Sequence, residues 1–389
     1  MEKKTLTVNM GPQHPATHGV LRVILEVEGE TIVKATPVVG YLHTGIEKTM
    51  ESKLYYKAIP CTDRMDYLSP MMNNLGFCLA VEKLMGIEVP EKVKWARVCL
   101  AELTRIKSHL VWLGTHAMDL GAVSMSLYTF REREMIVDIY EACGGQRMMS
   151  TYIRIGGLSH ELPPNFDKLV RTVLKDLPDR LNDYETLLTN NRIFIGRTKN
   201  VAVISAEDAI NWSLSGPMLR GSGVKQDLRK DNPYCGYENF DFDIAVGKTG
   251  DSYDRYLLRL EEIRQSLRII EQAIDGMPEG PYRAHVPGVV LPPKEDVLHK
   301  MESLIFHFKI ITDGFESPEG SVYQAVEASK GELGFYIASN GSNRPQRIRV
   351  RPPSFINLAA LPQLIEGSMV ADAVCAIGTL DIVLGEVDR

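Results

Sequence analysis

The chain has six cysteines among 389 residues but no C-x-x-C pair. Zinc sites and iron–sulfur clusters are usually built on such pairs, so neither is expected on this chain. Scattered thiols of this kind fit a reducing compartment. The cysteines are Cys61, Cys78, Cys99, Cys143, Cys235 and Cys375.

Nucleotide-binding and hydrolase motifs are also lacking. Gly247-Lys248-Thr249 is not a phosphate-binding loop, because Phe242 stands where the motif needs its first glycine. Gly221-Ser222-Gly223 is not a dinucleotide fingerprint, because Gln226 replaces the third glycine. No G-x-S-x-G or H-E-x-x-H occurs, so nothing supports a hydrolase. We interpret both glycine segments as turns.

Long apolar runs and an excess of positive charge are missing too. The net charge is −6, from 44 basic and 50 acidic residues, which argues against a nucleic-acid binder. The best candidate for a membrane span of roughly 20 apolar residues, Leu110–Tyr128, is broken by His116, Asp119 and two glycines. No signal-peptide pattern is visible at the start. We expect a cytosolic or peripheral protein that reaches a membrane only through partners.

Two periodicities predict the fold. Residues 4–9 and 20–39 predict a small antiparallel sheet, and helical spacing prevails from about residue 45 to 190 and over Asp251–Asp275. Asn340-Gly341 predicts a hairpin between Glu332–Ser339 and Arg347–Arg351. Other expected elements are a strand over Phe240–Ala245 and helices over Leu358–Glu366 and Ala371–Leu384.

These elements predict an α+β fold with three regions in one compact unit. The regions are an N-terminal β subdomain over 1–44, a helical bundle over 45–198 and a C-terminal mixed α+β region over 199–389.

The segment Gly11–Gly19 carries two histidines on a stretch that cannot be helical. His14 and His18 are four residues apart, but Pro15 lies between them. Two imidazoles on a stiff loop at the mouth of a sheet are typical of ligand binding or proton transfer. On spacing alone, a turn with surface or hydrogen-bonded core histidines is the more common structure.

Three other segments carry candidate groups. The Tyr67 phenol can donate a proton to a reduced oxygen; the alternative is a surface Arg64–Asp66 pair beside a half-buried Tyr. Asp119 ends an apolar helix, where a carboxylate either caps the next segment or orients a histidine. Arg131–Glu134 is typical of a solvated face or of a contact with a partner.

Eight segments together resemble one known family over essentially the whole chain. They are MGPQHPATHG (10–19), GYLHTGIEK (40–48), DRMDY (63–67), FRERE (130–134), YIRIGG (152–157), LRGSGV (219–224), RPPSF (351–355) and GEVDR (385–389). The sequence is similar to the 49 kDa-type (D-type) subunits of bacterial NADH-quinone oxidoreductase, respiratory complex I.

The family is related to the large subunits of nickel–iron hydrogenases, which hold their metal on two C-x-x-C pairs near the chain ends. In this sequence the first region has Cys61 alone, and the counterpart Leu380–Val387 has no cysteine. A nickel–iron centre requires thiolates, so the resemblance implies a hydrogenase-like fold without a metal site. In this family the vacated cavity houses a quinone headgroup.

The resemblance implies roles for five residues around that cavity. His18 corresponds to the quinone-ligating histidine, Tyr67 to the tyrosine opposite it, and Asp119 to the carboxylate that holds His18; these are the expected catalytic residues. Thr115 is expected to line the cavity and His14 to support the loop. A quinone that takes up two electrons needs two protons, which an imidazole and a phenol can supply.

Three more positions are distinctive within the resemblance. Arg64 corresponds to an arginine near the terminal iron–sulfur cluster, which belongs to the B-type partner subunit. Met149 stands where many relatives have a histidine near that cluster, and thioether sulfur takes up no proton. Ile382 replaces a proline that relatives often have after the aspartate, for which only local effects are expected.

The resemblance therefore implies a peripheral-arm subunit of a proton-pumping NADH:quinone oxidoreductase that is inactive alone. Quinone is its substrate; no cluster or flavin is expected on this chain, and NAD and 4Fe-4S clusters belong to partner subunits. The expected partners are the cluster-bearing B-type subunit, the C-type subunit, other peripheral-arm subunits and the H-type subunit of the membrane arm. The expected location is the cytoplasmic face of the bacterial inner membrane.

Three alternatives stay open. A complex I-like enzyme that uses ferredoxin or another donor would have a similar subunit. The large subunit of an energy-converting hydrogenase would need the missing cysteine pairs. A scaffold without chemistry would tolerate the loss of the Tyr67 hydroxyl.

Overall fold

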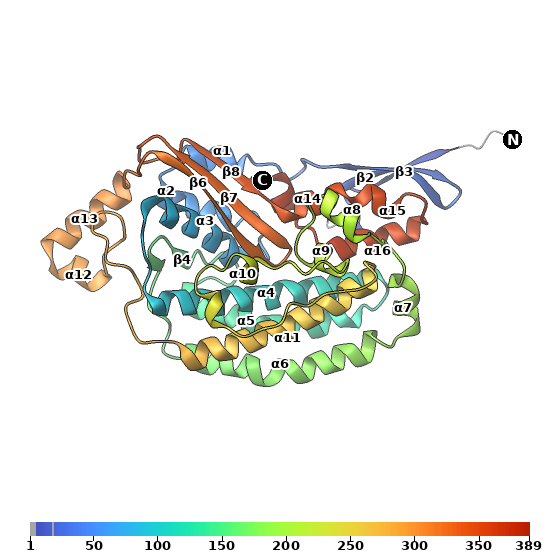
Figure 1. Cartoon of the computed structure of the whole chain (residues 1–389), viewed down its shortest axis with the longest axis horizontal. Coiled ribbons are helices and arrows are strands. Elements are labelled where there is room, and N and C mark those ends of the chain that lie inside the picture. The colour runs from blue at the N-terminus through green and yellow to red at the C-terminus, as the bar shows by residue number, and fades with distance from the viewer. Residues whose placement is uncertain (1–4, 18) are drawn as a thin grey trace.

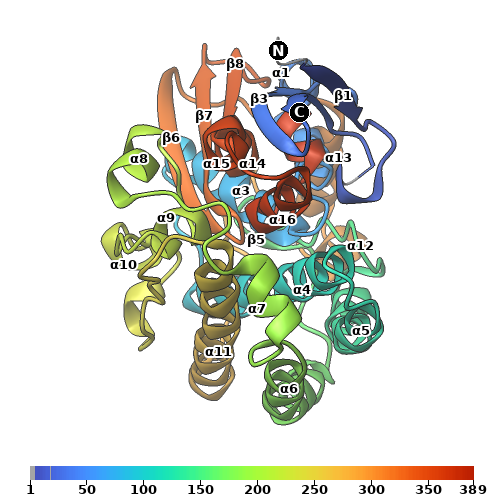
Figure 2. The ribbon, with the colours of Figure 1, turned by 90° about the vertical axis from the view of Figure 1, so that its right-hand side faces the viewer.

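Four long helices pack side by side as one layer of the molecule. The computed structural model describes residues 5–17 and 19–389. Within it, α4 contacts α5 and α11, and α6 contacts the same two, so the four helices close into a bundle that Figure 2 shows end-on. Their bounds are α4 (Glu91–Asp119), α5 (Ser124–Gly144), α6 (Phe166–Leu188) and α11 (Ser252–Gly276).

Helix α11 has the apolar stripe that its sequence predicts. Leu260, Ile263, Leu267 and Ile270 are buried along one face. Asp251 caps the helix by accepting a hydrogen bond from the backbone N of Asp254 (2.7 Å). The helix predicted over Asp251–Asp275 is confirmed.

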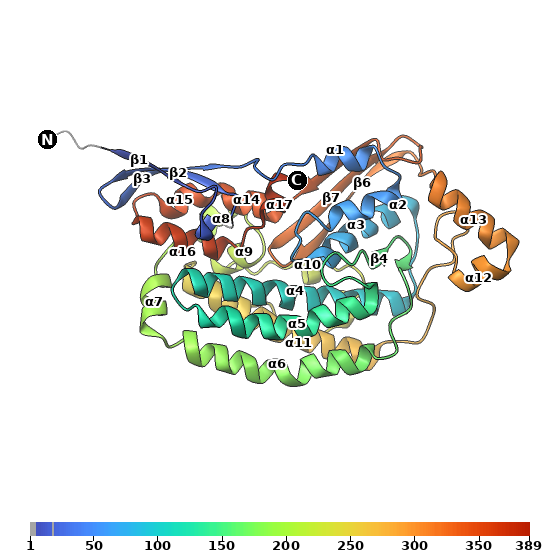
Figure 3. The ribbon, with the colours of Figure 1, turned by 180° about the vertical axis from the view of Figure 1, so that it is seen from behind.

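A three-stranded antiparallel sheet lies across the bundle, with α3 (Pro70–Met85) between them (Figures 1 and 3). Its strands follow the order β6 (Gly320–Ala328), β7 (Gly331–Ser339), β8 (Arg347–Arg351). The predicted hairpin is confirmed as β7 and β8; β6 was not predicted. At Gly76 of α3 a Cβ would lie 3.0 Å from the Phe335 ring, so the absent side chain allows helix and sheet to pack closely.

The predicted N-terminal sheet is confirmed. Its strands are β1 (Leu6–Met10), β2 (Arg22–Glu28) and β3 (Thr31–Val38), in that order. Its buried face shares an apolar cluster with α15 (Leu361–Ile365) and α16 (Val370–Leu380), so the two ends of the chain form one core (Figure 1).

Shorter elements complete the described part of the chain. They are α1 (Ile46–Glu51), α2 (Tyr55–Thr62), α7 (Arg192–Thr198), α8 (Ala206–Asn211), α9 (Pro217–Gly221), α10 (Leu228–Asp231), α12 (Lys294–His299), α13 (Met301–Thr312), α14 (Pro353–Ala359), α17 (Leu384–Asp388), the hairpin β4 (Ile153–Arg154) and β5 (Gly157–Leu158), and the 3-10 turns η1 (Pro15–Thr17) and η2 (Tyr237–Asn239). Helices and small antiparallel sheets together give the predicted α+β fold; the division into three regions stays a prediction. No helix of the described residues is long and apolar enough to cross a membrane.

The predicted strand over Phe240–Ala245 is wrong. Phe240 and Phe242 are buried and Asp241 and Asp243 are exposed, so the alternation is real. The partner, however, is a helix: glutamine side chains of α11 accept hydrogen bonds from the backbone N of Asp241 and Asp243 (2.9 Å each). The segment therefore satisfies its backbone without a neighbouring strand.

The C-terminal helices are shorter than predicted. The helix expected over Leu358–Glu366 is divided between α14 and α15. The helix expected over Ala371–Leu384 ends at Leu380, because Asp381 adopts a positive φ of 53° and α17 begins anew.

The expectation of a solvated face at Arg131–Glu134 holds only in part. Arg131 is exposed, but Glu132 is buried and accepts a hydrogen bond from the Tyr184 hydroxyl (2.6 Å). The segment therefore ties α5 to α6.

Two glycine-to-alanine changes in helices should have opposite effects on stability. At Gly378 a Cβ would lie 2.4 Å from Nδ1 of His116, whose ring stacks on Trp112. At Gly196 in α7 a Cβ would meet nothing within 4 Å. Gly378→Ala should lower the free energy of unfolding by about 1–3 kcal/mol through overpacking. Gly196→Ala should raise it by up to about 1 kcal/mol. Thermal unfolding of the two purified variants measures both, and shifts of equal sign would contradict this packing.

Candidate functional site

The loop after β1 is held by its own hydrogen bonds. The Thr17 hydroxyl donates to the carbonyl O of His14 (2.9 Å), and the backbone N of Ala16 donates to His14 Nδ1 (3.2 Å). Gly11 has a φ of 87°, and a Cβ there would lie 2.0 Å from the carbonyl O of Leu21, so only glycine fits. His14 is exposed, and His18 lies outside the residues that the structure describes.

Asp119 and His14 form one side of the candidate site. Asp119 is half-buried at the last turn of α4. Burial raises the pKa of its carboxyl, and the nearby His14 imidazole partly opposes this. The Asp119 carboxyl thus interacts electrostatically with His14 of the histidine loop, and its predicted contact with His18 concerns a residue outside the described part of the chain. Thr115, one turn earlier, is half-buried and donates to the carbonyl O of Val111 (3.0 Å).

Tyr67 lies on a second, firmly held loop, between α2 and α3. The Asn73 amide donates to the carbonyl oxygens of Thr62 (3.0 Å) and Asp66 (2.9 Å), which fixes the loop at both ends. The half-buried Tyr67 ring faces Gly385 of α17, where a Cβ would lie 3.5 Å from the ring. Burial raises the pKa of the Tyr67 phenol, Asp66 raises it further, and Lys330 opposes both.

Arg64 and Met149 lie on two connected segments. Arg64 is exposed and donates to the carbonyl O of Pro60 (2.6 Å), and Met149 is half-buried. The Thr151 hydroxyl donates to the Asp63 carboxylate, which ties the segment of Met149 to the loop of Arg64. Both residues therefore lie on segments that are joined to each other next to Tyr67.

The C-terminal helices connect the two loops. Helix α16 contacts both η1 and α4, which carry the histidine loop and Asp119. The Trp112 indole N of α4 donates to the carbonyl O of Gly378 in α16 (2.7 Å). Helix α17 follows α16 and lies against the Tyr67 loop, because a Cβ at Gly385 would be 2.6 Å from the carbonyl O of Met65. The end of the chain thus supports both sides of the site.

Four buried ionisable residues lie behind Tyr67. The sequence analysis named only Asp66 among them, in a possible surface pair with Arg64, and that alternative is wrong because Asp66 is buried and its ion-pair partner is Lys330. Lys330 Nζ lies 3.4 Å from Asp66 Oδ2 and 3.7 Å from Asp381 Oδ2, and it donates to the Ser108 hydroxyl (2.6 Å). Glu386 follows Gly385 in α17 and is 1% exposed. We call Asp66, Lys330, Asp381 and Glu386 the Lys330 cluster. Asp66 and Glu386 lie within the family motifs, but Lys330 lies in a turn without any local signal.

Glu386 has only neutral hydrogen-bond donors among the described residues. Its Oε2 accepts from the backbone N of Ser354 (3.2 Å) and from the Ser354 hydroxyl, while Oε1 has no hydrogen-bond partner in that part of the chain. Burial and the neighbouring Asp66 carboxylate raise the pKa of Glu386 to about 8, against the opposing effects of Ser354 and Lys330. Burial and the Asp66 carboxylate therefore both favour the protonated form of this carboxyl.

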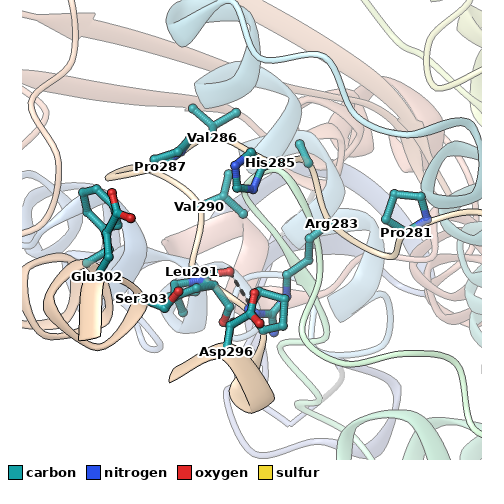
Figure 4. A pocket seen from close by; sticks show the side chains of 14 residues that line it. Pro281, Arg283, His285, Val286, Pro287, Val290, Leu291, Asp296, Glu302 and Ser303 are labelled. Atoms are coloured by element: carbon teal, nitrogen blue, oxygen red, sulfur yellow. Dashed lines mark hydrogen bonds between the residues drawn. The ribbon is translucent and has the colours of Figure 1, made fainter. Parts of the chain in front are cut away.

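The described residues form no group suited to a metal ion, and their cysteines are unpaired. A pocket of about 270 Å³ lies between the segment after α11 and the projecting pair α12–α13 (Figure 4). There the Arg283 guanidinium donates to the carbonyl O of Leu291 (3.0 Å). None of the predicted site residues lines this pocket.

The family model described as "Respiratory-chain NADH dehydrogenase, 49 Kd subunit" matches residues 119–389. The chain belongs to this family of 49 kDa subunits, as the sequence motifs predicted. It is 57% identical over 384 residues to the D subunit of NADH-quinone oxidoreductase from Geotalea uraniireducens (strain Rf4), over 99% of this chain and 98% of that protein. It is 56% identical to the protein of the same name from Citrifermentans bemidjiense, over 100% of both chains.

The raised pKa of Glu386 predicts how stability depends on pH. A carboxyl whose pKa rises on folding binds more protons in the native than in the unfolded state. The free energy of unfolding therefore falls by up to about 1.4 kcal/mol per pH unit as pH rises from the unfolded pKa near 4.5 to the folded pKa of about 8. Glu386→Gln should remove this slope.

Thermal midpoints of the wild type and the variant at pH 5.5 and 7.5 test this prediction. Glu132→Gln, which replaces a buried carboxylate outside the Lys330 cluster, is the matched control and should keep the wild-type slope. Equal pH dependence in Glu386→Gln and the wild type would contradict the prediction.

Proposed function

We propose that this chain is the peripheral-arm, 49 kDa-type subunit of a proton-pumping NADH:quinone oxidoreductase, that it is inactive alone, and that it forms the quinone headgroup site. The observation that carries the proposal is the half-buried Tyr67 phenol on a fixed loop. Asp119, whose carboxyl is influenced by His14, ends a helix that packs against the C-terminal helix α16. Family membership and the names of the relatives, which include the words NADH and quinone, support it.

The chemistry requires a proton donor for each quinone oxygen. Reduction by two electrons makes both oxygens basic, and two protons complete the quinol. Tyr67 is the proposed donor to one oxygen and His18 the donor to the other. Asp119 holds the imidazole in place, and His14 supports the loop beside the carboxylate. Thr115 contributes to the wall between them.

Electrons reach this site from a partner. Arg64 and Met149, which lie on segments joined through Thr151 and Asp63, are proposed to face the terminal 4Fe-4S cluster of the B-type partner subunit. NAD and the other clusters belong to partner subunits. The B-type, C-type and H-type subunits and other peripheral-arm subunits are the proposed partners, at the cytoplasmic face of the inner membrane.

Removal of the Tyr67 hydroxyl tests the site. In the assembled complex, Tyr67→Phe should lower the rate of quinone reduction by about 10² or more, because a positioned general acid contributes about 10²–10⁴-fold. Electron transfer from NADH to an artificial acceptor upstream of the quinone should be unchanged. Tyr336→Phe, at an exposed tyrosine of β7, is the control. Near-normal quinone reduction by an intact Tyr67→Phe complex would refute the proposal.

The side chain at position 149 should affect the redox potential of the partner's cluster. Methionine binds no proton on reduction, so the potential should change with pH by much less than the full one-proton slope. Met149→His should steepen the slope near neutral pH, because reduction would favour the imidazolium. A redox titration of the complex between pH 6 and 8 measures both. A full one-proton slope in the wild type would contradict the placement of Met149.

A further inference from the structure

We propose that the Lys330 cluster is a proton store that returns a proton to Tyr67 after each quinone reduction, with Glu386 as the group that releases it. This inference rests on the proposed function, because it concerns how the proposed donor is restored. Its chemistry is a proton transfer between oxygen atoms within this chain.

Charge and burial favour a proton in the cluster. Asp66, Asp381 and Glu386 are 1%, 3% and 1% exposed. The Lys330 ammonium lies within 4 Å of Asp66 and Asp381 and acts electrostatically on Glu386. Three carboxylates and one ammonium give the cluster a net charge of −2, which is unfavourable in the interior although the buried Arg259 guanidinium offsets part of it at Asp381. This balance favours a proton on one of the three carboxyls.

Contacts identify Glu386 as that carboxyl. Lys330 Nζ lies within 4 Å of Asp66 and Asp381, whereas the hydrogen-bond partners of Glu386 are the backbone N and hydroxyl of Ser354. Its neighbour Asp66 adds negative charge, which further favours the protonated form of Glu386.

Other charged groups lie near the Lys330 cluster, while Ser354 supplies the hydrogen bonds to Glu386. The Arg389 guanidinium at the end of α17 is influenced by Glu386, but Glu47 acts on it more strongly. The Lys107 ammonium of α4 lies 4.2 Å above the Tyr140 ring, and burial lowers its pKa to about 7. Burial also lowers the pKa of His109, which hydrogen-bonds to Glu262. A further nearby cation is Arg259 of α11, which acts on Asp381.

The cluster lies directly behind Tyr67. Asp66 precedes Tyr67, and Gly385, which faces the Tyr67 ring, precedes Glu386. Asp66 and Lys330 both act on the pKa of the phenol. Asp66 Oδ2, Asp381 Oδ2 and Glu386 Oε1 have no hydrogen-bond partner among the described residues, so each is a buried acceptor at which a mobile proton can bind.

The transfer balances without an oxidant or reductant. After Tyr67 gives its proton to the reduced quinone, the phenolate is stabilised by the Lys330 ammonium and destabilised by Asp66. The O–H bond of the Glu386 carboxylic acid then breaks and the phenol O–H bond of Tyr67 forms, with Asp66 as the intermediate acceptor. Glu386 is left as a carboxylate and takes up a proton from water before the next turnover.

Two substitutions in the assembled complex test the store. Glu386→Gln keeps the size of the side chain but removes its proton; it should lower kcat for quinone reduction about tenfold or more, with KM unchanged. Ser354→Ala removes a donor that stabilises ionised Glu386, so the pH above which kcat falls should move upward. The rate with an artificial acceptor and the spectrum of the terminal cluster should not change. Glu132→Gln is the control and should behave as the wild type.

The outcomes separate this inference from the function on which it rests. If Glu386→Gln has the same kcat and pH profile as the wild type, the proton-store proposal is wrong, even if Tyr67→Phe is inactive. If the Glu386→Gln complex fails to assemble, the pH dependence of kcat in Ser354→Ala decides. If the pH above which kcat falls is the same as in the wild type, the proton-store proposal is wrong. Normal quinone reduction by Tyr67→Phe overturns the proposed function itself.

Discussion

The Lys330 ammonium is the contact on which the arrangement behind Tyr67 depends. It joins the Tyr67 loop through Asp66, the end of α16 through Asp381 and the centre of α4 through Ser108. An ammonium without these partners would be unstable in the interior, and the carboxylates would be equally unstable without it. One charge thus fixes three segments that are distant in sequence, and it also fixes the electrostatic environment of the phenol.

Elements with one buried face were predictable from the sequence, because their apolar residues recur at the spacing of that face. The helix at Asp251–Asp275, the N-terminal sheet and the β7–β8 hairpin were found in this way. The segment Phe240–Ala245 has the same alternation, yet glutamine side chains of α11 take the place of a neighbouring strand. Nothing local in the sequence shows whether such a segment pairs with a strand or with a helix. The pattern therefore predicted the buried side chains correctly, but the predicted strand was wrong.

The candidate site was predictable mainly where its residues lie in recognisable motifs. Tyr67 and the histidine loop were chosen from such segments, and Asp119 was chosen from its place at the end of an apolar helix and from its counterpart in the family. Their proposed roles stay predictions, with His18 beyond the described residues. Lys330 could not be found, because its setting is created by residues that approach it only in the folded chain. Glu386 lies in a family motif, but its protonation follows from burial and from Asp66, which the sequence does not show.

The apolar core shared by the two ends of the chain has a consequence for biosynthesis. The buried face of the N-terminal sheet is covered by α15 and α16, which the ribosome makes more than 300 residues later. At a translation rate of about 5–20 residues per second, α15 and α16 are made on the order of half a minute after the sheet. During that time its apolar strands are exposed to other nascent chains, so chaperones have their longest opportunity to act on the first forty residues.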